Sequence, residues 1–186
     1  MFFLLRKIVL ALFAGLFLGL FVWFYLERHR LQPVADYGEL WWSSRNVETR
    51  SVGELDGEVV QVFTGDMLQL RGSDGLLYNF RLTGLEAPPA AAARDQAARR
   101  LFLLSKTNLS ELVLSNRVRI AMTYLSPLRA GAGIVRQGTN NINVRMVESG
   151  LVRVNRESIR ELPVPEQYRL VAAERKAQEQ QLALWR

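Results

Sequence analysis

The sequence predicts an α+β protein in which a small barrel of five β-strands carries about three helices and follows one membrane-spanning helix. Three observations lead to this expectation. An uncharged apolar stretch runs from residue 8 to 26, short segments with alternating apolar residues lie between 58 and 83, and helical periodicity appears in 90–104 and 165–185.

The chain of 186 residues divides into three parts on this pattern. Residues 1–27 form the expected transmembrane anchor, 28–53 a juxtamembrane linker and 54–186 a folded domain. One domain of ordinary size plus an appendage suits a chain of this length.

Composition limits the chemistry that the chain can perform. There is no cysteine, and the one histidine, His29, lies beside the apolar stretch. We therefore expect no disulfide, thiolate zinc site, cysteine nucleophile or catalytic histidine. The net charge is +6, and the basic residues are arginines apart from Lys7, Lys106 and Lys176. This arginine bias fits phosphate contacts but also GC-rich codon usage, so it identifies no partner.

The apolar stretch is long enough to cross a bilayer. As an α-helix, residues 8–26 would span roughly 28 Å, which matches the hydrocarbon core. Charged residues flank the stretch, and Trp23 and Tyr25 lie where an interfacial aromatic belt falls. A cleaved signal peptide is the alternative, but the stretch is long for one and lacks a small-residue cleavage site. We expect an uncleaved single-pass anchor, whose topology the balanced flanking charges leave open.

Small residues recur along this predicted helix. Ala11, Gly15 and Gly19 are spaced by four and form one smooth stripe, which permits close packing of a second helix. Glycine and alanine are also common in membrane helices for other reasons, so the stripe only suggests a packing face.

The linker contains a tryptophan pair. Residues 28–53 show mixed charge and no sustained period of 2 or 3.6, which is typical of a connector. Trp41 and Trp42 need some apolar surface, which is either the bilayer or a neighbouring protein, or the barrel that follows.

The domain begins with three short strands. We expect strands over 58–63, 67–71 and 76–83, with Gly72–Gly75 as the hairpin turn between the last two. A fourth strand is predicted at 117–124 and a weaker fifth at 132–137.

Helices interleave with these strands. Alanine and leucine at helical spacing predict a helix over 90–104. A short helix is expected over 140–149, with Gly150 as its cap, and an amphipathic helix over 165–185. Residues 151–154 form a further extended piece. Five strands with a helix between the third and fourth is the order of an OB-fold barrel.

Several motifs in one order resemble the staphylococcal nuclease (thermonuclease-like) family. Thr64-Gly65-Asp66-Met67 stands where the family has Asp-Gly-Asp-Thr, Phe80-Arg81-Leu82 matches its arginine strand, and Glu86-Ala87-Pro88-Pro89 stands for Asp-Thr-Pro-Glu. The passage 143–154 and the chain end at Leu182–Trp185 fit as well. The resemblance covers about Gly57 to Trp185 and implies an OB-fold domain.

In active members of that family, two aspartates hold calcium, two arginines clamp the scissile phosphate and a glutamate acts as the base. Carried over, Asp66 matches the first calcium ligand, Glu86 replaces the second, and Arg81 matches the first clamp. Arg129 matches the second clamp only if the alignment slips by one residue. Pro89 replaces the base, and a proline cannot take a proton.

Two further positions depart from the family pattern. Thr64 replaces an acidic residue, and Ala87 replaces a threonine and so lacks its hydroxyl. Losing the base and part of the ligand set together would remove most of the rate enhancement, because a general base alone contributes about 10²–10⁴. We therefore expect no catalytic residue, metal or cofactor. Asp66, Arg81, Glu86 and Arg129 are expected as family-equivalent positions without catalysis, with Arg81 paired to Asp66 or Glu86.

Three functions follow from these observations. The first is a membrane-anchored, catalytically inactive accessory or structural subunit of a larger membrane complex, which contacts other subunits and lipid. The second is a membrane-tethered nucleic-acid-binding module, and the third an active calcium-dependent nuclease. The absent cysteines and the anchor suit a mitochondrial inner-membrane subunit, for example of a respiratory or ATP synthase assembly, and we favour this over a bacterial inner membrane.

Overall fold

The computed structural model describes residues 15–19, 22–23, 25, 34–35, 37–42, 51–90 and 95–186. Contacts between Cα atoms divide the chain into two compact units, residues 1–39 and 40–186. The described residues from 34 to 42 are helical, where the sequence predicts only a connector. Trp41 and Trp42 are 52 % and 69 % exposed.

The predicted transmembrane span lies largely outside the described residues, as does Ala11. Among the residues that are described, no helix is both long and apolar enough to cross a membrane. Gly15 and Gly19 are helical, and a Cβ added at either would meet no heavy atom within 4 Å. The packing role of the small-residue stripe stays a prediction.

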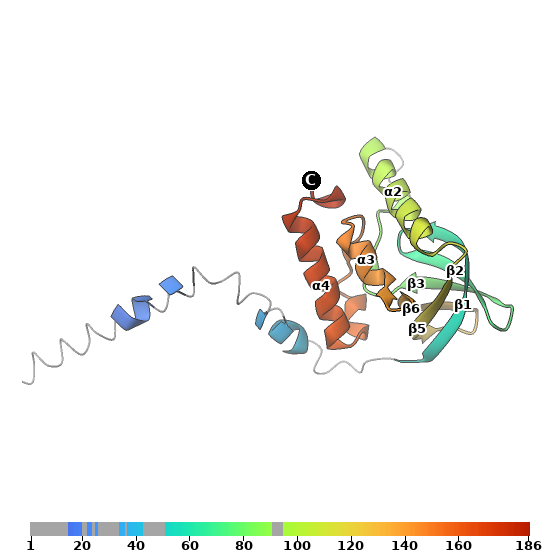
Figure 1. Ribbon diagram of the computed structural model, residues 1–186, viewed down its shortest axis with the longest axis horizontal. Coiled ribbons are helices and arrows are strands. Elements are labelled where there is room, and N and C mark those ends of the chain that lie inside the picture. The colour runs from blue at the N-terminus through green and yellow to red at the C-terminus, as the bar shows by residue number, and fades with distance from the viewer. Residues whose placement is uncertain are drawn as a thin grey trace, which may run out of the picture. The chain divides into compact units, whose positions relative to one another are not determined.

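Five strands form a closed barrel (Figure 1). They are β1 (Gly53–Thr64), β2 (Met67–Gly72), β3 (Leu77–Leu82), β5 (Arg117–Leu125) and β6 (Ala130–Gln137). Neighbours in the order β3, β2, β1, β5, β6 run antiparallel, and a parallel pairing of β3 with β6 closes the ring. The barrel of five strands is therefore confirmed.

Strand β1 is longer than the sequence predicts. Its first half pairs with β5 and its second half with β2, and Gly57 and Glu58 are paired on both sides. The additional residues before Glu58, Gly53–Gly57, contain glycine and acids that are depleted in isolated strands, but pairing with β5 overrides that preference. Register irregularities after Val59 and Val62 let the strand bend around the barrel.

Alternating apolar residues fill the barrel interior. Inward-facing side chains on β2, β3 and β5 are almost fully buried, and they include Leu68, Leu70, Phe80, Leu82, Val118 and Ile120. This period of two is the pattern expected of strands with one buried face.

The closing pair β3–β6 depends on a small residue. A Cβ added at Gly131 would lie 2.5 Å from Cε1 of Phe80 and 2.8 Å from the carbonyl oxygen of Tyr124. Both distances are far below van der Waals contact, so any side chain at this position would push β6 away from the aromatic ring of Phe80.

Helix α2 (Gln96–Val113) differs in its bounds from the predicted helix over 90–104. The Asp95 side chain caps the amino end by accepting a hydrogen bond from the backbone N–H of Ala97, at 2.9 Å. At the other end, buried Leu109 and Val113 are four residues apart and continue the apolar face that packs on β1.

Helices α3 (Ile142–Glu148) and α4 (Val164–Glu179) pack side by side, with α3 against β6 of the barrel and α4 against the short strand β8 (Arg153–Val154) (Figure 1). Gly150 follows α3 with φ of +69°, which confirms the predicted left-handed cap. Helix α4 buries Leu170, Ala173 and Ala177 as predicted.

The chain end does not continue α4 to Trp185 as predicted. Helix α4 ends at Glu179 because Gln181 and Ala183 have positive φ, and a short 3-10 helix follows over Ala183–Trp185. The backbone N–H of Leu184 donates to the carbonyl oxygen of Gly150 at 3.1 Å. The chain end is therefore held against the cap of α3.

One buried amide joins α3 to the closing strands. The side chain of Asn143 accepts from the N–H of Val135 at 2.9 Å and donates to the carbonyl oxygens of Thr83 and Gly133, at 2.9 and 3.3 Å. Asn143 is 1 % exposed, so these bonds form away from water.

Three very short strands complete the fold. β4 (Leu85–Glu86) pairs with β8 (Arg153–Val154), and β7 (Asn140–Asn141) extends the edge at β6. Buried Glu174 of α4 holds β8 by accepting from the N–H of Val154 at 2.7 Å and from Arg156. A 3-10 helix over Ser158–Glu161 leads into α4.

Candidate functional site

The turn between β1 and β2 positions Asp66 at the barrel edge. Gly65 lies against α2, since a Cβ there would be 2.6 Å from Cβ of Ser105. Asp66 is only 8 % exposed. Its Oδ1 accepts a hydrogen bond of 2.6 Å from the hydroxyl of Thr64, and its backbone carbonyl accepts from the N–H of Leu82.

Arg81 forms an ion pair with Asp66. Asp66, in the β1–β2 turn, directly precedes Met67, which is the cross-strand partner of Arg81. Arg81 Nε lies 3.7 Å from Asp66 Oδ2, and the Arg81 side chain is 64 % exposed whereas that of Asp66 is 12 % exposed. The expected pairing of Arg81 with Asp66 is present.

Glu86 takes no part in this ion pair. It is exposed on β4, opposite Arg153 of β8. No hydrogen bond or ion pair to Glu86 is found among the residues that the structure describes. The guanidinium of Arg153 instead lies over the ring of Trp185, 5.3 Å from its centroid, a cation–π geometry.

Pro89, at the position that matches the family's base, borders a small hollow. Pro89 is exposed, and together with Pro88, Ala98, Leu101 and Leu184 it lines a cavity of about 220 Å³ that also touches Glu86 and Arg153. Glu86 supplies the one carboxylate of this lining within the described part of the chain.

Arg129 lies at the opposite end of β3 from the Asp66–Arg81 pair. It follows the β5–β6 turn with φ of +61°, and its carbonyl oxygen accepts from the N–H of Asn79. Its charge acts on Asp74 and Tyr78 of the β2–β3 hairpin. Among the described residues, the structure therefore joins Asp66 and Arg81 in an ion pair, and neither Glu86 nor Arg129 takes part in it.

Asp66, the position that matches the family's first calcium ligand, is already engaged by its neighbours. Calcium takes about six to eight oxygen ligands, mostly from carboxylates and carbonyls. One oxygen of Asp66 accepts from Thr64, and the other faces the cationic Arg81. In the described ranges, no group of three or more acidic residues or histidines lies close enough together to hold a metal.

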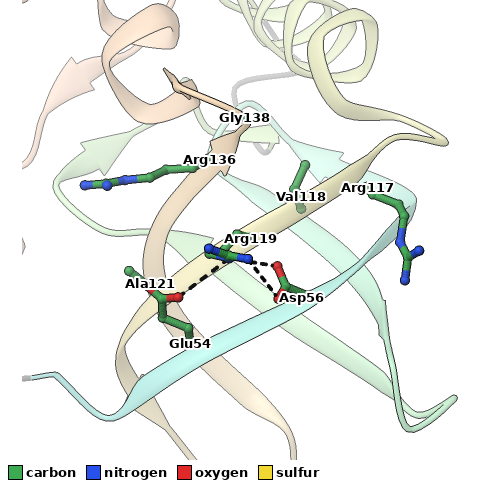
Figure 2. A pocket seen from close by; sticks show the side chains of 8 residues that line it. All are labelled: Glu54, Asp56, Arg117, Val118, Arg119, Ala121, Arg136 and Gly138. Atoms are coloured by element: carbon green, nitrogen blue, oxygen red, sulfur yellow. Dashed lines mark hydrogen bonds and ion pairs between the residues drawn. The ribbon is translucent and has the colours of Figure 1, made fainter.

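Sequence reasoning missed a second, charged hollow on the outer face of β1, β5 and β6 (Figure 2). It has a volume of about 500 Å³. Arg119 donates to both carboxylate oxygens of Asp56, at 2.9 and 3.4 Å, and lies 3.6 Å from Glu54. Asp56, and to a lesser degree Glu54, raises the pKa of Arg119. The alternation of acids on β1 with arginines on β5 could have indicated this ladder.

The arginines of this hollow do not converge on one point. Figure 2 shows Arg136 and Arg117 extending to opposite sides of Arg119. Arg136 donates to buried Glu166 of α4 at 2.8 Å, which turns it away from the hollow. Arg119 and Arg136 are thus engaged with carboxylates, and the hollow has no focused anion site.

A comparison with protein families matches residues 79–186 to the family described as Staphylococcal nuclease homologue. The chain belongs to the staphylococcal nuclease family. The match agrees with the closed five-stranded barrel and its three long helices. No curated protein matches the chain. The matched region includes Arg81, Glu86 and Pro89, while Asp66 lies before it.

Proposed function

We propose that this protein is a membrane-anchored, catalytically inactive member of the staphylococcal nuclease family that serves as an accessory or structural subunit of a larger membrane complex. The arrangement at the barrel edge carries the proposal. Asp66 is engaged by Thr64 and Arg81, Glu86 takes no part in that pairing within the described residues, and Pro89 stands where the family has its base.

Hydrolysis of a phosphodiester needs a base for the attacking water and positive charge on the phosphoryl oxygens. Here the exposed Arg81 is the single arginine beside Asp66 within the described residues, and its charge is partly neutralised by that carboxylate. Without a base, about 10²–10⁴ in rate is lost before any loss from missing metal ligands is counted. The intact core barrel suits a binding or scaffolding role instead.

The apolar stretch 8–26 supports membrane attachment, and its small-residue stripe at Ala11, Gly15 and Gly19 supports contact with other membrane helices. A mitochondrial inner-membrane respiratory or ATP synthase assembly is the favoured setting. A bacterial inner membrane would place the same demands on the chain.

The test is the size of the native particle. The full chain, solubilised in mild detergent from its own membrane, is expected to migrate on native gels within a complex, with neighbours identified by cross-linking mass spectrometry. The matched variant Gly15→Leu with Gly19→Leu keeps the apolar character of the span but fills its stripe, and is expected to weaken the assembly. A lone monomer with no co-purifying subunit would overturn the proposal.

A membrane-tethered nucleic-acid-binding module is the second candidate, favoured by the exposed Arg81. An arginine guanidinium can hold a phosphate without catalysis. This function requires that the full chain binds single-stranded oligonucleotides with an affinity that falls as salt increases. Absence of binding at low salt would remove it. An active calcium-dependent nuclease is the least favoured function.

A further inference from the structure

Two neighbouring turns at one end of the barrel expose leucine side chains. Leu128 in the β5–β6 turn is 90 % exposed, and Leu76 and Leu77 after the β2–β3 turn are 40 % and 44 % exposed. We call these three leucines, together with Arg71 and Arg129, the barrel tip. The β2–β3 hairpin extends away from α3 and α4 (Figure 1).

Backbone pairing holds the two turns beside each other. The N–H of Asn79 donates to the carbonyl oxygen of Arg129 at 2.9 Å, directly before the parallel pair of Asn79 with Ala130. Leu77 is in turn the cross-strand partner of Arg71. The turn that carries Leu128 and the start of β3 at Leu77 therefore lie side by side.

The turn that carries Leu128 is well ordered by its own hydrogen bonds. The N–H of Ser126 donates to the carbonyl oxygen of Ala130 at 2.8 Å, and the N–H of Arg129 donates back to Ser126 at 3.0 Å. The hydroxyl oxygen of Ser126 also accepts from the N–H of Ala130. Leu128 is thus held out at the apex of a fixed turn, where exposure to water is unfavourable for its side chain.

Charges at the tip are balanced rather than strongly cationic. Arg71 and Arg129 are both exposed. Glu58 is the cross-strand partner of Arg71, and the carboxylate of Asp74 accepts from the hydroxyl of Tyr78. A leucine apex with arginines behind it matches the phospholipid interface, where apolar groups reach the acyl boundary and guanidinium groups meet headgroup phosphates.

We propose that the barrel tip docks on the phospholipid headgroup layer, with Leu128 inserted to the acyl boundary and Arg129 on headgroup phosphate. This inference rests on the proposed membrane anchor, which keeps the domain beside a bilayer. With the described residues from 34 to 42 kept helical, residues 27–52 can reach at most roughly 70 Å, so the chain allows the tip to meet the same membrane.

The experiment uses the absence of cysteine in the chain. Leu128→Cys in the full chain is labelled with an environment-sensitive dye and reconstituted into phosphatidylcholine–phosphatidylglycerol vesicles, with and without doxyl-labelled lipid. Gln178→Cys, exposed on α4, is the matched control. The dye at 128 is expected to shift to the blue and to lose most of its emission to the doxyl lipid, while the dye at 178 keeps its emission.

A second pair of variants separates insertion from general proximity. A dye at Leu77→Cys is expected to be quenched, and adding Leu128→Asp is expected to remove that quenching, because a carboxylate resists entry into the acyl boundary. Vesicle flotation after an alkaline wash tests the anchor independently, because the wash removes proteins that are only bound to the membrane surface and leaves membrane-spanning proteins in the vesicles. If the protein floats after the wash but the dye at 128 is unquenched, the docking inference is wrong and the anchor stands. If the wash strips the protein although the dye at 128 was quenched beforehand, the tip docks and the anchor is wrong.

Discussion

The buried amide of Asn143 offers the sharpest test of how the barrel is closed. In Asn143→Ala, the N–H of Val135 and the carbonyl oxygen of Thr83 lose the partners described above, and both residues are at most 2 % exposed. The carbonyl oxygen of Gly133 keeps a bond from the N–H of Thr83 at 2.9 Å. Two buried groups are therefore left unpaired.

Each unpaired group costs about 1–3 kcal/mol, so the free energy of unfolding is expected to fall by about 2–6 kcal/mol. This is a large part of the roughly 5–15 kcal/mol that stabilises an ordinary domain. At about 2–4 °C per kcal/mol, Tm is expected to fall by roughly 4–24 °C. Thermal and urea unfolding of the full chain in detergent, followed by circular dichroism, would measure both quantities.

Asn79→Ala is the matched control, because that exposed amide makes one side-chain hydrogen bond, to Gln69. Its effect is expected to stay within about 0.5 kcal/mol, as for most surface substitutions. If Asn143→Ala destabilised the protein no more than Asn79→Ala, the buried amide would not be what joins α3 to the closing strands.

Two further predictions concern the closing strand and the hairpin. Gly131→Ala is expected to lower the free energy of unfolding by about 1–3 kcal/mol through the clash with Phe80, whereas Ala130→Ser on the exposed side should be neutral in the same melts. The hydrogen bond from the hydroxyl of Tyr78, and to a lesser degree that from the N–H of Leu76, lowers the pKa of Asp74 below its ordinary 3.8. The ionised Asp74 therefore stabilises the fold above pH 3.8, and this stabilisation is lost as the pH falls through the lowered pKa. Tyr78→Phe should return the pKa of Asp74 toward 3.8 in an NMR titration, and an unchanged titration would show that the hydroxyl is not the cause.

The sequence predicted those parts of the fold that local patterns encode. The strands over 67–71 and 76–83 follow from a period of two and a glycine turn, and the αL cap at Gly150 follows from its place after a short helix. The family match over 79–186 confirms the domain that the ordered motifs suggested.

Parts that depend on distant neighbours could not be predicted. The parallel pairing of β3 with β6 and the two-residue pair of β4 with β8 have no signal in their own residues. The end of α4 was misplaced because Leu182 and Trp185 continue its apolar spacing, although the backbone there turns back to pack on Gly150.

The sequence predicted one pairing in the candidate site, but not where the other expected residues lie around it. Asp66 and Arg81 are joined as expected because Asp66 directly precedes Met67, which pairs with Arg81 across β2 and β3. Arg129 lies in the turn before β6. The hydrogen bond between its carbonyl oxygen and the N–H of Asn79 shows that this turn adjoins β3, which the sequence does not indicate. The ladder around Arg119 joins strands far apart in the sequence and was not foreseen.

The central claim is that the barrel is used as a scaffold and not as a nuclease. The most direct measurement is calcium-dependent cleavage of labelled single-stranded DNA by the purified full chain, compared with Asp66→Ala and with an active family member. The account predicts that the wild type and Asp66→Ala are equally inactive, while both remain folded. Cleavage by the wild type that requires calcium and disappears in Asp66→Ala would contradict it.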